Sequence, residues 1–185
     1  SGHGDFRLVS DLPRSDAAPL HATERYGYAA IADGVPEVLR RVREQLMQGA
    51  SQIKIMAGGG ISSNFDPLDV TQYTEDEMRA AVAAAADWGT YVTVHAYTPR
   101  AVQAAIRAGV RCIDHGQLLD EETVRIMSDK GLWWSLQPFI DDGDSRFPEG
   151  SPSRVKQLEM YNGTDTAYAL AKKHGIKVAW GTDIL

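Results

Sequence analysis

Cysteine is almost absent from this sequence, which has only Cys112 in 185 residues. A single cysteine excludes an intrachain disulfide and a zinc site built from several thiolates. Positive charge is also in short supply, because 19 Lys and Arg face 25 Asp and Glu, for a formal net charge of −6. Without a dense basic cluster, the sequence disfavours binding to nucleic acid or to an anionic membrane surface.

Long apolar runs are missing as well. No stretch reaches the roughly 18 consecutive apolar residues of a membrane-spanning helix, and the first residues lack the pattern of a secretory signal. Hydrophobic residues make up 43% of the chain and charged residues 24%, which is an ordinary globular balance. We therefore expect one globular domain over residues 1–185, located in the cytoplasm.

Helical and strand patterns alternate along most of the chain. Residues 6–32 have little periodicity and are typical of an irregular connection. Helices are predicted over residues 33–49, 74–88, 98–109, 120–131 and 153–174, the last open to interruption at Asn162–Gly163. Strands are predicted over residues 52–57, 91–96, 110–114, 132–137 and 177–180. This alternation indicates an α/β fold with a parallel sheet covered by helices.

Polar residues mark where these helices begin. The sequence predicts N-caps at Asp33, Thr98 and Asp120, since short polar side chains accept hydrogen bonds from the first turn of a helix. Thr74 and Glu77 have the spacing of a capping box.

Four side chains that could bind or serve a metal stand near the same ends of successive strands. Lys54 lies in the first predicted strand and His95 ends the second. His115 follows the third strand, and Asp183 follows the fifth. In parallel α/β folds, ligands and catalytic groups gather at the carboxyl ends of the strands. Imidazole and carboxylate suit zinc and related divalent ions, so this placement predicts a metal site that activates water.

Each of these residues also has an ordinary structural use. A histidine at a strand end often only hydrogen-bonds within the protein, Asp183 could cap a helix, and a lysine commonly reaches solvent. Lys54 is anomalous because an ammonium has no lone pair for a cation. Burial between Ile53 and Ile55 would favour the neutral amine, which can add carbon dioxide to form a carbamate.

Several segments resemble the amidohydrolase superfamily. They are IKIMAGGGISS, QYTEDEMRAAV, VTVHAYTPRAVQAAIRAGVRCIDHG, LLDEETVRIMSDKG and KVAWGTD. The resemblance is to the imidazolonepropionase-like and prolidase-like branch, which includes metal-dependent Xaa-Pro dipeptidases and carboxypeptidases. It runs from Gly2 to Asp183. It implies a TIM (β/α)8 barrel, of which this chain would hold about strands 4 to 8 with their connecting helices.

The resemblance also implies which residues would hold metal. Lys54 would carry a carbamate that bridges two Zn²⁺ ions, with other divalent metals as alternatives. His95 and His115 would bind the second ion, and Asp183 would contact the first.

Catalytic and substrate-binding roles follow from the same resemblance. Asp183 would shuttle the proton of the nucleophilic water, and Tyr97 would point its hydroxyl at the substrate carbonyl. His3, in the segment GHGD, would contact the substrate.

One family motif is missing from the sequence. Family members carry His-x-His at the end of the first barrel strand, whereas the five histidines here are all isolated. The chain starts without Met, stops just after GTD, and falls short of the roughly 250 residues of a closed barrel. We expect an internal piece of a longer enzyme, with an incomplete site of its own. Its edge strands would pair with the missing barrel segments or with a second copy, which favours a homo-oligomer.

The function that the resemblance implies is metal-dependent hydrolysis of an amide bond. The main expectation is a prolidase-like dipeptidase or carboxypeptidase that acts on a small peptide or an acylated amino acid through a metal-bound hydroxide. Alternatives are a hydrolase of cyclic amides, as imidazolonepropionase is, and a metal-binding fragment without catalysis. A phosphate site at Gly58–Gly60 is a further alternative, disfavoured because no helix begins directly after the glycines.

Overall fold

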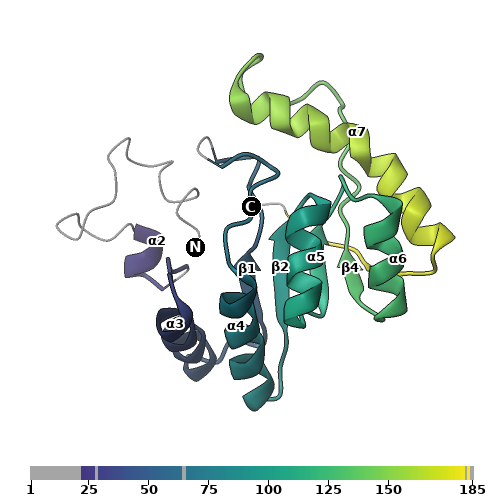
Figure 1. Ribbon diagram of the computed structural model, residues 1–185. Coiled ribbons are helices and arrows are strands. Elements are labelled where there is room, and N and C mark those ends of the chain that lie inside the picture. Colours follow the sequence, from purple (N-terminus) through teal and green to yellow (C-terminus); the bar gives the residue numbers. More distant parts are fainter. Residues whose placement is uncertain (1–21, 28, 64–65, 182, 184–185) are drawn as a thin grey trace.

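The computed structural model of this chain describes residues 22–27, 29–63, 66–181 and 183, which form a parallel sheet flanked by helices (Figure 1). The strands run side by side in sequence order, each parallel to the next. Their bounds are β1 Ile53–Met56, β2 Val92–Ala96, β3 Cys112–His115, β4 Trp133–Ser135 and β5 Lys177–Ala179. The sheet is the predicted one, with each strand shorter by one to three residues.

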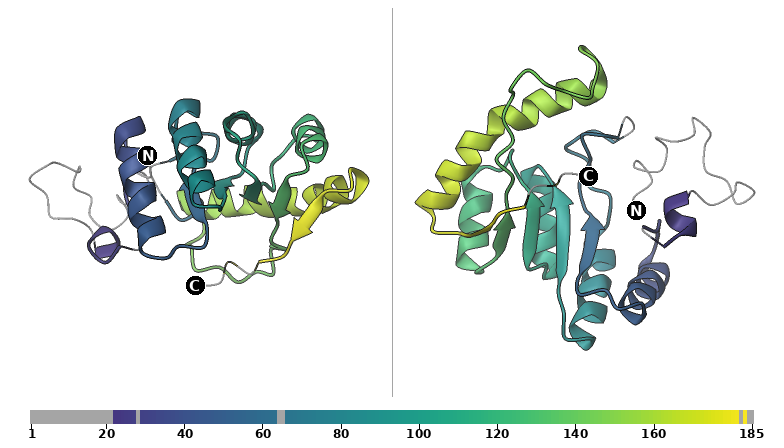
Figure 2. Two further views of the ribbon diagram at one scale, coloured as in Figure 1. Left: turned by 90° about the horizontal axis from the view of Figure 1, so that it is seen from below. Right: turned by 180° about the vertical axis from the view of Figure 1, so that it is seen from behind.

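Helices alternate with these strands. Their bounds are α2 Ala22–Arg25, α3 Val35–Met47, α4 Glu75–Asp87, α5 Pro99–Ala108, α6 Glu121–Asp129 and α7 Pro152–Lys173. Helices α3 to α6 lie next to one another on one face of the sheet, as the views from below and from behind show (Figure 2). Among the described residues, no helix combines the length and apolar character needed to cross a bilayer.

The main hydrophobic core lies between the sheet and this layer of helices. Val94, Ile113 and Trp134 are fully buried on the strand side, and Met78 and Val124 meet them from α4 and α6. Each large apolar side chain that is fully buried in this way contributes about 1.5–3 kcal/mol. The other face of the sheet carries polar side chains, and it is there that the candidate site lies.

The sequence predicted the starts of three helices at the right residues. Thr74 and Glu77 form the expected capping box at α4, and the Asp120 carboxylate accepts the Thr123 N–H at α6 at 2.8 Å. Thr98 occupies the N-cap position of α5, but its side chain makes no capping hydrogen bond.

The predicted start of the first long helix was wrong by one residue. Gly34, rather than Asp33, occupies the N-cap position of α3. Its φ of 80° suits glycine, and its N–H donates to Glu77 of α4 at 2.6 Å. The start of α3 therefore has no side-chain cap, and Glu77 of the neighbouring helix binds the N–H of the N-cap residue instead. The region 6–32, predicted to be irregular, contains the short helix α2.

Helix α7 is continuous through Asn162–Gly163, where the sequence left an interruption open. A Cβ atom on Gly163 would lie 2.2 Å from the carbonyl oxygen of Gln117, so only glycine lets α7 cross the loop after β3 at this range. Met160 and Tyr161, just before the crossing, line the pocket described below. The glycine is therefore a close-packing residue rather than a helix break.

Gly163→Ala is expected to destabilise the protein by about 1–3 kcal/mol, because the added methyl group collides with backbone. This loss should outweigh the gain of about 1 kcal/mol that alanine normally brings to a helix interior. Denaturant unfolding measures the difference. Asn162→Ala is the matched control, since Asn162 is exposed on the same turn, and it should be neutral or slightly stabilising. A Gly163→Ala protein as stable as the control would contradict the close-contact argument.

Candidate active site

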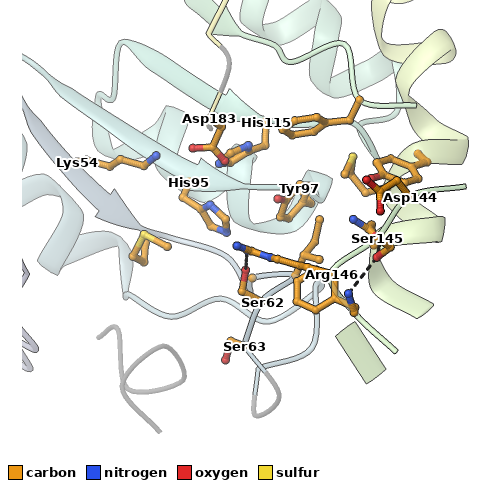
Figure 3. A pocket seen from close by; sticks show the side chains of 18 residues that line it. Lys54, Ser62, Ser63, His95, Tyr97, His115, Asp144, Ser145, Arg146 and Asp183 are labelled. Atoms are coloured by element: carbon orange, nitrogen blue, oxygen red, sulfur yellow. Dashed lines mark hydrogen bonds between the residues drawn. The ribbon is translucent and has the colours of Figure 1, made fainter. Parts of the chain in front are cut away.

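A cavity of about 640 Å³ opens at the carboxyl ends of the strands (Figure 3). Five residues that the sequence predicted as site residues line this cavity. They are Lys54 from β1, His95 and Tyr97 from the end of β2, His115 from the end of β3, and Asp183 after β5. Five of the six predicted site residues are therefore brought to one place. His3 lies outside the described residues.

His95 is buried near the end of β2, with its ring against the loop that follows β1. Its Nε2 lies 2.9 Å from the carbonyl oxygen of Gly59. A carbonyl oxygen only accepts, so Nε2 carries the proton and Nδ1 keeps the lone pair. Burial lowers the pKa of His95 to about 3, and the adjacent His115 adds to the effect. His95 is thus a neutral imidazole with one nitrogen free to bind a cation.

His115 is held in the opposite tautomer. Its Nδ1 lies 2.9 Å from Oε1 of Gln137. Because the amide nitrogen of Gln137 donates to the Ser135 carbonyl at 3.1 Å, Oε1 is the atom that faces the ring and accepts its N–H. This leaves Nε2 of His115 with the lone pair. Burial lowers the pKa of His115 to about 4, with a further contribution from Lys54.

The backbone of His115 is strained. Its φ is 74°, a value uncommon for a residue with a side chain. Strand alternation alone would put His115 on the same side as Ile113, which packs in the core. The positive φ ends this alternation and allows the ring to line the pocket instead, at a cost of about 1–3 kcal/mol. Trp134 Nε1 stabilises the turn by donating to the His115 carbonyl at 2.6 Å.

Tyr97 completes a cluster of three rings. Its centroid lies 5.1 Å from each of the His95 and His115 rings, and the two imidazole centroids are 4.6 Å apart. Burial, reinforced by the negative charge of Asp183, raises the pKa of Tyr97 well above its ordinary value. The phenol therefore keeps its proton and is available as a hydrogen-bond donor at neutral pH.

Lys54 is not buried between Ile53 and Ile55, and that expectation was wrong. The two isoleucines point into the core, whereas alternation along β1 sends Lys54 to the opposite face. There its side chain is 43% exposed, and Nζ lies 3.1 Å from Oδ2 of Asp114. Thr93 holds the other oxygen of that carboxylate at 2.9 Å. A carbamate on Lys54 would meet the negative charge of Asp114, so its formation needs a cation beside it.

Asp183 reaches the pocket from the segment after β5. It is exposed and lines the cavity. Its backbone is in the left-handed region, with a φ of 50°. Figure 3 shows Asp183 among the side chains that line this cavity, together with His115 and Lys54. The arrangement combines two neutral imidazoles, a protonated phenol and a carboxylate around one space, which are the groups that acid–base chemistry on a polar substrate requires.

The model of the amidohydrolase family matches residues 8–184. The chain belongs to the amidohydrolase family. This amidohydrolase chain is 33% identical to ochratoxinase of Aspergillus niger over 190 residues, which cover 99% of the chain and 40% of ochratoxinase. A prolidase solved with N-methylphosphonate-L-proline is 35% identical, with a TM-score of 0.83 over 99% of this chain and 45% of the prolidase. A Xaa-Pro dipeptidase with methionine bound in its active site is 31% identical, with a TM-score of 0.79 over 99% and 45%.

These likenesses confirm the predicted fold class. The five parallel strands and their helices match part of the TIM barrel of solved amidohydrolases. The amidohydrolase chain spans less than half the length of these relatives. The numbering of its strands within a complete barrel, as strands 4 to 8, stays a prediction.

The donor atoms fit a divalent cation in part. Over the described stretches, no three His, Cys, Asp or Glu side chains are grouped so that they could hold a metal ion. The lone pairs on Nδ1 of His95 and Nε2 of His115 nevertheless suit zinc and related ions. Hydrogen bonds to Gly59 and Gln137 fix both tautomers, as outer partners of metal-binding imidazoles commonly do. The two imidazoles thus supply part of a coordination shell.

Arg146 is a pocket residue that the sequence did not reveal. It belongs to the loop before α7, stacks over the Phe147 ring at 5.0 Å and donates to Ser62 Oγ at 3.0 Å. Within the described part of the chain, no carboxylate forms an ion pair with Arg146. The sequence carried only a weak signal for Arg146. A loop rich in Pro, Gly and Asp after a strand indicates only that the loop lies at the carboxyl ends of the strands.

Proposed function

We propose that this amidohydrolase cleaves an amide bond next to a free carboxylate, in a dipeptide or an acylated amino acid, with the help of a divalent metal. One observation carries the proposal: two neutral imidazoles with lone pairs, a protonated phenol, a carboxylate and an arginine without an ion-pair partner among the described residues line a single cavity. Such a pocket combines metal-binding, proton-transfer and anion-binding groups.

Each group has a definite task in this chemistry. His95 and His115 would hold the cation, together with Lys54 if it carries the carbamate. A divalent cation supplies Lewis-acid activation of water when it is bound. Asp183 accepts the proton of the attacking water and passes it to the departing nitrogen, a contribution of about 10²–10⁴-fold. Tyr97 donates its O–H to the carbonyl oxygen as negative charge develops there.

The substrate class is supported by the pocket and by the relatives. The guanidinium of Arg146 can bind a carboxylate through two parallel, charge-assisted hydrogen bonds. Phe139 and Met160 give the same cavity an apolar wall for the side chain of the substrate. The relatives include a prolidase solved with N-methylphosphonate-L-proline and a Xaa-Pro dipeptidase solved with methionine. L-Proline, methionine and any dipeptide with an unmodified C-terminus carry a free carboxylate.

A substrate panel on the full-length protein tests this function. We expect turnover of dipeptides and N-acyl amino acids, loss of turnover with a chelator and recovery with Zn²⁺. A C-terminally amidated dipeptide should be a much poorer substrate, because Arg146 then loses its anionic partner. Turnover of cyclic amides alone would favour the imidazolonepropionase-like alternative. Metal binding without turnover of any amide would favour the non-catalytic one.

Arg146→Gln tests the proposed contact with the substrate carboxylate. A hydrogen bond to a charged group is worth about 1.5–3 kcal/mol, so KM for the free dipeptide should rise by about 10–100-fold with little change in kcat. KM for the amidated dipeptide should hardly move. Arg125→Gln, on the exposed surface of α6, should change neither value. Equal losses on both substrates in Arg146→Gln would contradict this role.

A further inference from the structure

The Lys156 side chain extends from α7 into the loop that follows β1, and oxygen atoms of that loop surround its ammonium group. Its Nζ donates to the carbonyl of Gly60 at 2.7 Å, to that of Asp66 at 3.0 Å and also to that of Ser63. Oδ1 of the Asp66 carboxylate lies 4.0 Å away, and the lysine side chain is only 13% exposed. Three N–H donors thus meet three backbone acceptors, and the cation is held inside the protein.

We call residues 58–63 and 66–67 the glycine loop. Asp66 organises its centre, because its carboxylate accepts the Gly60 N–H at 3.1 Å and the Gln72 side chain at 3.3 Å. Gly59 is essential for the tight path, since a Cβ there would lie 1.9 Å from the Pro67 carbonyl oxygen. The loop therefore turns several oxygens inward around one point. Rings of carbonyl oxygen are the surroundings that monovalent cations choose in proteins.

The glycine loop is also the support of His95. The Gly58 N–H donates to the His95 carbonyl at 2.9 Å, and the Gly59 carbonyl accepts the imidazole N–H. Lys156 contacts the residue that follows these two glycines. The position of the ammonium is thus coupled, through three consecutive backbone units, to the tautomer and orientation of the imidazole.

We propose that the glycine loop is a monovalent-cation site that the Lys156 ammonium occupies from within, and that this tethered cation positions His95. Lys156 is a positioning residue in this scheme and touches no substrate. Removal of its charge leaves the buried Asp66 carboxylate and the three carbonyls facing one another, which is strongly unfavourable. A small ammonium ion added from solution would then take the vacant place. The cation site itself does not depend on the proposed hydrolase function.

The test uses Lys156→Ala in the full-length protein, with salts compared at equal ionic strength. We expect the unfolding midpoint to fall by about 5–15 °C and the hydrogen-bonded Nε2 proton of His95 to vanish from its downfield position in the NMR spectrum. Butylammonium, which replaces the missing stem and charge, should restore about half of the midpoint loss and bring the His95 signal back. Butanol, which has the stem without the charge, should do neither.

Lys172→Ala is the matched control, because Lys172 is exposed on the same helix, and its midpoint should not depend on which cation is present. Equal rescue by butanol and butylammonium would overturn the cation site, since the loss would then be one of packing. A His95 proton signal unaffected by Lys156→Ala would overturn the positioning role. If Lys156→Ala does not fold in any of the salts, Lys156→Gln is tested in its place. A wild-type unfolding midpoint in this uncharged variant would overturn the proposal. A lowered midpoint that ammonium ions raise would support it.

Discussion

Asp183→Asn is expected to lower kcat of the full-length enzyme by about 10²–10⁴-fold. The amide has nearly the shape of the carboxylate but cannot take up a proton, so the water and the departing nitrogen both lose their proton carrier. His95 and His115 are untouched, so binding of the proposed divalent cation should persist. Steady-state kinetics together with metal content measures both halves of this expectation.

Asp144→Asn is the control for that experiment. Asp144 is an exposed carboxylate that lines the same cavity, so its neutralisation changes the charge of the pocket by the same amount. Its kcat should stay within a few-fold of the wild-type value. If Asp183→Asn stayed fully active, or if both variants lost activity equally, proton transfer by Asp183 would be excluded.

His95→Ala is expected to weaken binding of Zn²⁺ by at least about 100-fold, because outer-partner changes alone commonly cost 10–100-fold. Turnover should disappear with the metal. Competition with a chromophoric chelator measures the affinity without reference to activity. Gln137→Leu, which removes the acceptor for the His115 N–H together with the donor to the Ser135 carbonyl, should give a smaller loss of affinity.

His174→Ala is the matched control for the histidine substitution. His174 lies at the C-cap of α7 and contacts Glu121 at 3.0 Å, and it is not one of the described residues that line the cavity. Its loss should leave Zn²⁺ affinity unchanged. A His95→Ala protein that binds Zn²⁺ as tightly as the wild type would remove His95 from the metal site.

Local patterns in the sequence were enough to predict the sheet and the starts of α4, α5 and α6. The capping box of Thr74 and Glu77 is a local interaction, and it appears where the sequence placed it. The start of α3 was missed because its partner Glu77 lies 43 residues away from Gly34. Crossing of α7 at Gly163 is equally non-local, since it depends on the backbone of Gln117.

The candidate site was likewise predictable from the sequence only in part. A general rule for parallel sheets, that polar groups at strand ends converge, was sufficient to bring His95, His115 and Asp183 together. The rule says nothing about the positive φ of His115, because no sequence pattern signals it. The role of Lys156 could not be predicted, for a different reason. Its partner Gly60 lies 96 residues away in the sequence, and a lysine in an amphipathic helix is typical of a solvated surface.

The close crossing at Gly163 has a consequence for how the cavity could change shape. Helix α7 carries Met160 and Tyr161 to the cavity, and its close approach to the loop after β3 is possible only because that glycine has no side chain. A larger residue there would have to push this part of the cavity wall away from the Gln117 carbonyl, at the cost in stability predicted above, while no cavity-lining residue changed. Laboratory evolution confined to cavity-lining positions would overlook this route to a differently shaped cavity.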